Sequence, residues 1–329
     1  MPSVSDSTLA SPQQRRKRII MAEPRGFCAG VERAIGMVEK ALELYGAPVY
    51  VRKQIVHNQH VVNELEKQGA RFVDSEDEVP EGAICVFSAH GVSPAVRGNA
   101  EQRELKVIDA TCPLVAKVHQ EARRSADAGR KILLIGHANH EEVEGTVGEA
   151  PAETVVVESV EEARALEFAP GTVLSYLTQT TLSLDETKDI IEELTRRFPD
   201  IKGPGSDDIC YASQNRQNAV KDIAAQTDLV LVVGSDNSSN SVRMVEVAIR
   251  QGTPSHLVND VSKLDEQWLE GVEAVGVTAG ASAPEVLVQE LVQRLAALGY
   301  QDVDSVTTTT EDVVFSIPGS LFAHAGVQR

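Results

Sequence analysis

The stretch RGFCAGVERAIGMVEKAL, residues 25–42, decides the first element of the fold. Val31, Ile35, Val38 and Leu42 recur at the spacing of one helix face, which predicts a helix that begins directly after Cys28. A cysteine in that position meets free backbone amides and the positive end of the helix dipole. Both favour the thiolate, which is the form that ligates metals.

Two further cysteines stand in the same context. Cys112 precedes Pro113, whose fixed φ suits a first helical position, and the pattern predicts a helix through about Ala128. Cys210 precedes a helical stretch from about residue 215 to 226. The alternative is three unrelated buried cysteines, since free cysteine is among the most buried residue types. Three such contexts in one chain favour a shared site, whereas Cys85 lies inside an apolar run and is expected in the core.

The spacing of these cysteines predicts the domain organisation. Separations of 84 and 98 residues each correspond to one small domain, so we expect three α/β units that present one cysteine each to a common centre. The predicted division is a disordered tail at 1–18, domains at 19–112, 113–209 and 210–300, and a C-terminal extension at 301–329. The tail is basic at its end and could instead be a transit peptide.

Apolar runs followed by polar loops recur along the chain. The runs that predict strands are residues 50–56, 84–87, 131–135, 173–177, 229–233 and 274–277. Such runs alternating with helices predict α/β domains with mainly parallel sheets, covered on both faces. Ligands of such sheets bind beyond the carboxyl ends of the strands, where these loops fall. The loops carry His, Ser, Thr and Asn, which hold phosphate oxygens but also simply make turns.

Composition excludes several classes of function. A net charge of −18 in 329 residues disfavours broad electrostatic binding to nucleic acid or to an anionic membrane. Apolar runs such as 229–233 are far shorter than the ~18 residues of a membrane span. Four cysteines are too few for a disulfide scaffold and no apolar signal segment precedes them, so we expect a cytoplasmic protein.

The spacing and the chemistry of the cysteine thiols indicate which metal they could bind. Structural zinc sites usually draw on closely spaced cysteine pairs, which this sequence lacks. Soft thiolates suit iron–sulfur clusters as well. Three sulfur ligands on a four-iron cluster would leave one iron open for a substrate.

Ten motifs in order resemble the 4-hydroxy-3-methylbut-2-enyl diphosphate reductase family of LytB-type iron–sulfur enzymes in non-mevalonate isoprenoid synthesis. The match runs from Ile19 to Phe315. The motifs are GFCAGV (26–31), VHN (56–58), SAHGV (88–92), DATCPLV (109–115), GHA (136–138), VEGT (143–146), TQTTL (178–182), DDICYA (207–212), NSSNS (237–241) and TAGASAP (278–284).

The resemblance implies a pseudo-threefold cloverleaf of α/β domains around one [4Fe-4S] cluster per chain. Cys28, Cys112 and Cys210 match the family's cluster ligands. Glu142 matches the carboxylate that delivers a proton, and Thr180 its hydroxyl neighbour. The positions that match the diphosphate pocket are His57, His90, His140, Ser238, Asn240 and Ser282, with Ser239 adjoining them. Glu141 departs from the proline that many relatives carry.

The implied reaction reduces an allylic diphosphate with electrons from a ferredoxin- or flavodoxin-type protein. We expect protonated imidazoles to help hold the trianionic substrate. Two other classes of protein would also use three cysteines. A non-redox iron–sulfur dehydratase would need no electron donor, but the sequence lacks an evident arginine clamp for a carboxylate substrate. An iron–sulfur sensor would have no use for so many polar loop residues.

Overall fold

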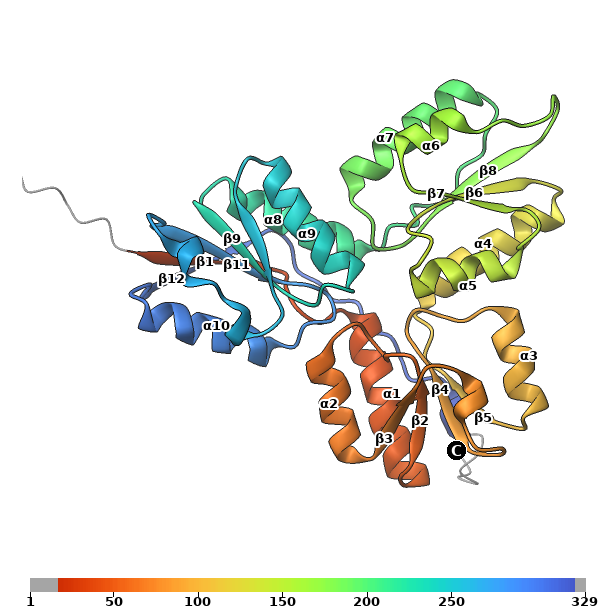
Figure 1. The fold of residues 1–329 in the computed structure, drawn as a ribbon, viewed down its shortest axis with the longest axis horizontal. Coiled ribbons are helices and arrows are strands. Elements are labelled where there is room, and N and C mark those ends of the chain that lie inside the picture. The colour runs from red at the N-terminus through yellow and green to blue at the C-terminus, as the bar shows by residue number, and fades with distance from the viewer. Residues whose placement is uncertain (1–16, 323–329) are drawn as a thin grey trace, which may run out of the picture.

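The apolar runs form parallel strands in three separate sheets, and each sheet is the centre of one lobe of the molecule (Figure 1). The structure is a computed structural model that describes residues 17–322. Every pairing between named strands in this range is parallel. The prediction of an α/β fold with mainly parallel sheets is confirmed. No helix within residues 17–322 has both the length and the apolar character needed to cross a bilayer.

The first lobe contains a four-stranded sheet in the order β3-β2-β4-β5. Alternate strand residues face opposite sides, so Val86 packs with α1 whereas Cys85 and Phe87 pack on the face covered by α3. Cys85 is fully buried there, as expected for a core residue. The elements are α1 (Ala29–Tyr45), β2 (Val49–Arg52), α2 (Gln59–Gln68), β3 (Ala70–Val73), a 3-10 turn (Glu76–Glu78), β4 (Ile84–Phe87), α3 (Pro94–Gln102) and β5 (Lys106–Asp109).

The second lobe contains a three-stranded sheet in the order β7-β6-β8. Leu133 and Ile135 of β6 pack against α6 and α7, while Ile132 and Leu134 pack against α4 and α5. The elements are α4 (Pro113–Asp127), β6 (Lys131–Ile135), α5 (Glu141–Glu149), β7 (Thr154–Val157), α6 (Val160–Ala165), β8 (Leu174–Thr178) and α7 (Leu184–Arg197).

The third lobe contains a five-stranded sheet in the order β10-β9-β11-β1-β12. Helix α10 covers one face and helices α8 and α9 cover the other. The elements are β1 (Arg18–Glu23), α8 (Tyr211–Ala224), β9 (Leu229–Val233), α9 (Ser239–Arg250), β10 (Ser255–Val258), 3-10 turns (Val261–Lys263 and Glu266–Leu269), β11 (Ala274–Ala279), α10 (Glu285–Ala297) and β12 (Asp302–Thr307).

Strand pairing corrects the predicted domains at both ends of the chain. Residues 19–23 were assigned to the first domain, yet β1 lies between β11 and β12 in the third sheet. Residues 302–307, assigned to a C-terminal extension, form the edge strand β12 of that sheet. Arg18 belongs to β1 rather than to the tail, and residues 1–16 lie outside the described range. The boundaries at 112/113 and 209/210 remain predictions.

Two predicted elements have different limits. The strand expected at 50–56 ends at Arg52, because Lys53 adopts a left-handed φ of 57° and its amide donates to the Val73 carbonyl. The helix expected from residue 215 begins at Tyr211. Cys210 therefore directly precedes α8, as Cys28 precedes α1 and Cys112 precedes α4.

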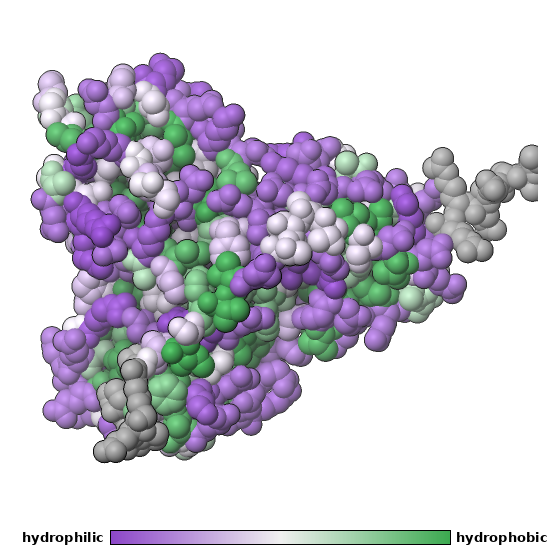
Figure 2. Space-filling model, turned by 180° about the vertical axis from the view of Figure 1, so that it is seen from behind, coloured by the Kyte–Doolittle hydropathy of each residue, from purple (hydrophilic) through white to green (hydrophobic). Residues whose placement is uncertain are grey.

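The segment after β12 runs from the third lobe back to the first (Figure 1). It ends in a short 3-10 turn, Gly319–Phe322, and Leu321 there is fully buried in the core of the first lobe. On the way, the Glu311 carboxylate pairs with Arg216 of α8. Figure 2 shows polar side chains over most of the visible surface, with apolar patches toward the middle of the molecule.

The fully buried Arg216 joins two lobes and this segment. Its Nη2 donates to the carbonyls of Gly26 at 2.7 Å and Phe27 at 3.1 Å, and its Nη1 lies 3.1 Å from Glu311 Oε1. Gly26 and Phe27 directly precede Cys28, whereas Arg216 stands on the helix that Cys210 begins. Arg216 therefore fixes one predicted cluster ligand relative to another.

We expect Arg216→Met to lower the free energy of unfolding by about 3–5 kcal/mol, because it leaves two carbonyls and a carboxylate buried without their donor. Arg196→Met is the matched control, since Arg196 is 68% exposed and pairs only across the surface with Glu193. That control should change the unfolding free energy far less than Arg216→Met does, because a solvent-screened ion pair contributes little. Denaturant unfolding measures both, and equal effects of the two substitutions would contradict the assignment.

Candidate active site

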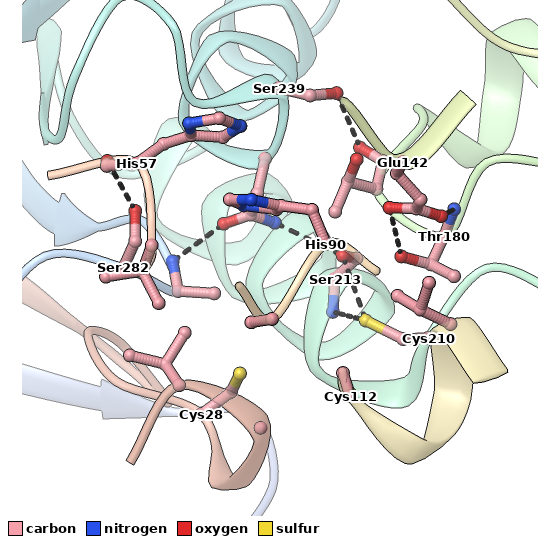
Figure 3. Close-up of a pocket in the computed structure, with 18 of the residues that line it drawn as sticks. Cys28, His57, His90, Cys112, Glu142, Thr180, Cys210, Ser213, Ser239 and Ser282 are labelled. Carbon is pink, nitrogen blue, oxygen red and sulfur yellow. Dashed lines mark hydrogen bonds between the residues drawn. The ribbon is translucent and has the colours of Figure 1, made fainter. Parts of the chain in front are cut away.

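The three lobes meet at a cavity of about 100 Å³ that contains side chains from all of them. Figure 3 shows Cys28, Cys112 and Cys210 on one side of this cavity, with His57, His90 and Glu142 further along it. All twelve of the predicted site residues line it. They are Cys28, His57, His90, Cys112, His140, Glu142, Thr180, Cys210, Ser238, Ser239, Asn240 and Ser282.

Five helices begin at this cavity. The residues that precede their first turns all line it, and these are Cys28 of α1, Cys112 of α4, His140 of α5, Cys210 of α8 and Ser238 of α9. Helix N-termini carry free amides and partial positive charge. Their convergence provides a region that attracts anions within a protein whose net charge is −18.

The thiols lie close together because a glycine makes room for them. A Cβ atom on Gly30 would lie 2.9 Å from Cys112 Sγ and 3.8 Å from Cys28 Sγ, so only a residue without a side chain fits between the two sulfurs. Cys210 Sγ contacts Ser213 Oγ at 3.1 Å and accepts a hydrogen bond from the Ser213 amide at 3.3 Å. All four cysteines of the chain are free thiols.

Burial affects the pKa of two of these thiols more strongly than the helix N-termini do. Desolvation raises the pKa of Cys112 to about 12 and that of Cys210 to about 11. Without a bound cation, burial therefore favours the protonated thiol at these two residues, against the helix N-termini that favour the thiolate. A cation that compensates the buried negative charge would be needed for the thiolate form, and soft cations such as iron have that affinity for sulfur.

Three histidines face one another at the other side of the cavity. The His57 and His90 rings are stacked with centroids 3.9 Å apart, and the His140 ring meets both edge-on at 5.2 and 5.8 Å. Burial lowers the pKa of His57 far below its usual range and that of His140 to about 3. Both rings are therefore neutral in the free protein, and protonated imidazoles in the complex with the anionic substrate remain a prediction.

The neutral His140 ring has a defined tautomer. Its Nδ1 accepts the Glu142 amide at 3.2 Å and so caps α5, which leaves the proton on Nε2. His90 Nδ1 lies 3.1 Å from Glu141 Oε2, an interaction that sequence reasoning did not predict. His57 Nδ1 lies 3.4 Å from the Asn237 side-chain nitrogen.

Glu142 is a buried carboxyl group held by one partner. It is 2% exposed, and its two oxygens accept hydrogen bonds from the Thr180 amide at 2.7 Å and the Thr180 hydroxyl at 3.0 Å. Burial raises the pKa of Glu142 to about 7, although the hydrogen bonds from Thr180 lower it. This carboxyl group can therefore hold or release a proton near neutral pH.

The polar residues of the third lobe form a hydrogen-bonded group. Ser282 Oγ donates to the His57 carbonyl at 3.0 Å and lies 3.4 Å from Ser238 Oγ. Asn240 Oδ1 accepts the Ala281 amide at 2.8 Å, and its Nδ2 donates to Ser213 Oγ at 3.3 Å. Ser239 Oγ has one long contact, 3.5 Å to the Thr181 carbonyl. These contacts hold the loops after β9 and β11 together.

Ser213 is the site residue that sequence reasoning missed. It connects Cys210 with Asn240 and lines the cavity. The usable signal was its place three residues after Cys210, where a helix N-cap side chain meets a backbone amide. Because the helix after Cys210 was predicted to begin at about residue 215, the sequence did not indicate that Cys210 caps it near Ser213.

Comparisons with known proteins agree with this geometry. The family model described as LytB protein matches residues 19–296. A protein of Acidothermus cellulolyticus named 4-hydroxy-3-methylbut-2-enyl diphosphate reductase is 59% identical over 94% of this chain and 92% of its own. One of the same name from Mycolicibacterium paratuberculosis is 57% identical over 97% of this chain and 96% of its own.

A solved structure has the same fold. It is titled as the E-1-hydroxy-2-methyl-but-2-enyl-4-diphosphate reductase from Plasmodium falciparum, with a TM-score of 0.91 and 41% identity over 94% of this chain and 98% of that chain. Sequence and structure thus agree over nearly the whole length, and the chain belongs to the LytB protein family.

Proposed function

We propose that this chain is an iron–sulfur enzyme that reduces (E)-4-hydroxy-3-methylbut-2-enyl diphosphate to isopentenyl and dimethylallyl diphosphates, the last step of the non-mevalonate pathway. The observation that carries the proposal is one cavity lined by three thiols, a buried carboxyl group and three histidines. The names of the family's relatives support a reductase over a non-redox dehydratase or a sensor.

The reaction consumes two electrons and two protons. The allylic C–O bond breaks, the hydroxyl group leaves with one proton as water, and a C–H bond forms with the other. We infer that the electrons come from a ferredoxin- or flavodoxin-type protein. The free thiols of all four cysteines fit a reducing compartment such as the cytoplasm.

We propose Cys28, Cys112 and Cys210 as the ligands of one [4Fe-4S] cluster. The donor set fits, because three cysteine sulfurs from three helix starts line one cavity and Gly30 leaves space between two of them. When bound, the cluster supplies electrons and a Lewis-acidic iron for the leaving hydroxyl group.

The diphosphate would bind at the polar end of the cavity. His140 offers its Nε2–H, and Ser238, Asn240 and Ser282 offer hydroxyl and amide groups beside the N-terminus of α9. These donors are neutral, so the helix N-termini carry much of the attraction for the anion. His57, His90 and Ser239 complete the group.

Glu142 would deliver a proton to the leaving oxygen. Its pKa of about 7 keeps much of it protonated at neutral pH, and Thr180 holds both oxygens in place. A donor with a pKa near the working pH combines the correct protonation state with the driving force for transfer.

The first test is anaerobic turnover of the diphosphate with a chemical reductant by enzyme that contains an intact cluster. We expect both five-carbon diphosphates to form only when the reductant is present. Loss of water from the substrate without reductant, giving a diene diphosphate instead of these two products, would favour the dehydratase, and no conversion at all would contradict the proposal.

We expect Glu142→Gln to lower kcat by about 10²–10⁴-fold, the range for loss of a general acid. The amide retains an acceptor for the Thr180 amide, so unfolding at pH 8 should not become easier. Glu144→Gln is the matched control, because Glu144 is exposed on the same helix and the chemical replacement is the same. Similar kcat values for the two variants would contradict the role of Glu142.

The pH dependence of kcat should follow the same carboxyl group. The proton donor is the neutral form, so kcat should fall as pH rises above about 7 and approach a tenfold loss per unit. The free energy of unfolding should also fall as pH rises. Folding raises the pKa of this carboxyl group, so the native state becomes less stable between about pH 4.5 and 7. Glu142→Gln should remove both dependences, as pH-rate profiles and unfolding measurements would report.

Removing a ligand thiol should remove the cluster. We expect Cys28→Ala, Cys112→Ala and Cys210→Ala each to reduce bound iron and visible absorbance to a small fraction of wild type. Cys85→Ala should leave both unchanged, because Cys85 is buried in β4 away from the cavity. Iron analysis of anaerobically purified protein checks this, and a full complement of iron in any of the first three variants would exclude that residue as a ligand.

A further inference from the structure

Glu141 is a charged residue at the pocket to which the proposed reaction gives no task. Its Oε2 lies 3.1 Å from His90 Nδ1, and its side chain is 22% exposed. A carboxylate beside the proposed diphosphate pocket repels an anionic substrate rather than binding it. The negative charge of an acidic side chain in this position favours a cationic ligand.

The groups around Glu141 have the arrangement of a metal site. One ligand atom each from His57, His90 and Glu141 lie within 4.8 Å of one another. The stacked rings of His57 and His90 are seen beside each other in Figure 3. Small side-chain rotations would bring the three atoms to the roughly 3.4 Å separation of ligands in a tetrahedral zinc site.

The His57 ring supplies an independent observation. His57 is 8% exposed, and its Nε2 is buried without a hydrogen-bond partner among residues 17–322. A buried polar atom without a partner destabilises the fold, and a bound ligand would offset this cost. Burial also lowers the pKa of His57, and neutral imidazole is the form that binds metals.

We propose that His57, His90 and Glu141 bind Zn²⁺ or a similar borderline divalent cation, and that this cation excludes the allylic diphosphate. Two imidazoles and one carboxylate are a ligand set known from zinc enzymes, whereas Mg²⁺ prefers oxygen ligands. His90 would bind the cation through Nδ1 as a neutral imidazole, with its single ring proton on Nε2, so that coordination of the cation by His90 and Glu141 takes the place of the hydrogen bond between them. The cation thereby occupies the nitrogen atoms with which the substrate would interact, so the exclusion of substrate rests on the proposed function.

Calorimetry with ZnSO₄ and the cluster-containing enzyme, without substrate, tests the site. We expect one Zn²⁺ per chain at these residues, no binding of Mg²⁺, and an affinity at least tenfold lower in Glu141→Gln. Glu144→Gln should bind Zn²⁺ as wild type does, because Glu144 is exposed and outside the group. Equal affinity of Glu141→Gln and wild type would overturn the site.

Steady-state kinetics test the exclusion of substrate. Zn²⁺ should raise KM without changing kcat, and Glu141→Gln should need at least tenfold more Zn²⁺ for the same relative rise in KM while keeping the wild-type kcat. A lower KM with Zn²⁺ would overturn the proposal, since the cation would then help to bind the diphosphate.

Iron content and visible absorbance are followed in parallel, and loss of iron in proportion to the Zn²⁺ taken up would overturn the proposal by placing the cation at the cluster. Failure of the proposed function is distinguishable, because turnover would be absent while zinc binding persisted.

Discussion

Three helices have to begin at one point for three thiols to meet, and the buried side chain of Arg216 fixes two of these starts. It binds the carbonyls that precede Cys28 from the helix that follows Cys210. A guanidinium group without water is stable only when its donors are fully used, so the contact tolerates little displacement. Glu311 completes the coordination and brings the C-terminal segment into the same contact. Arg216 thus joins the first and third lobes from a buried position, beside contacts such as that of Ser282 Oγ with the His57 carbonyl.

The site combines strong desolvation with little formal charge. Burial raises the pKa of Glu142, Cys112 and Cys210 and lowers that of His57 and His140, so each of these is neutral near pH 7 or close to its midpoint. Partial positive charge comes instead from five helix N-termini. Such dipoles are fixed by the fold and need no counterion, which suits anionic ligands in an acidic protein. Glu141 is the exception, and its charge favours a cation.

Much of the fold and the site was predictable because the signals are local. Apolar runs such as Leu229–Val233 became strands with the expected bounds, and Pro113 marked the start of α4. The polar residues after strands came together because parallel strands end at one edge of each sheet. The strand after Tyr50 was predicted too long, since hydrophobicity alone does not reveal the left-handed φ of Lys53.

The sequence by itself determined the three parallel α/β sheets, the helix starts at Cys28 and Cys112, and the set of residues expected at the site. Only the tertiary structure decided that β1 belongs to the third sheet, because pairing between strands more than 250 residues apart leaves no periodic signal in either. The tertiary structure also decided which protonation states the cysteine and histidine side chains of the site adopt. Desolvation depends on how deeply neighbouring lobes bury a group, and in the free protein it favours the neutral forms of Cys112, Cys210, His57 and His140.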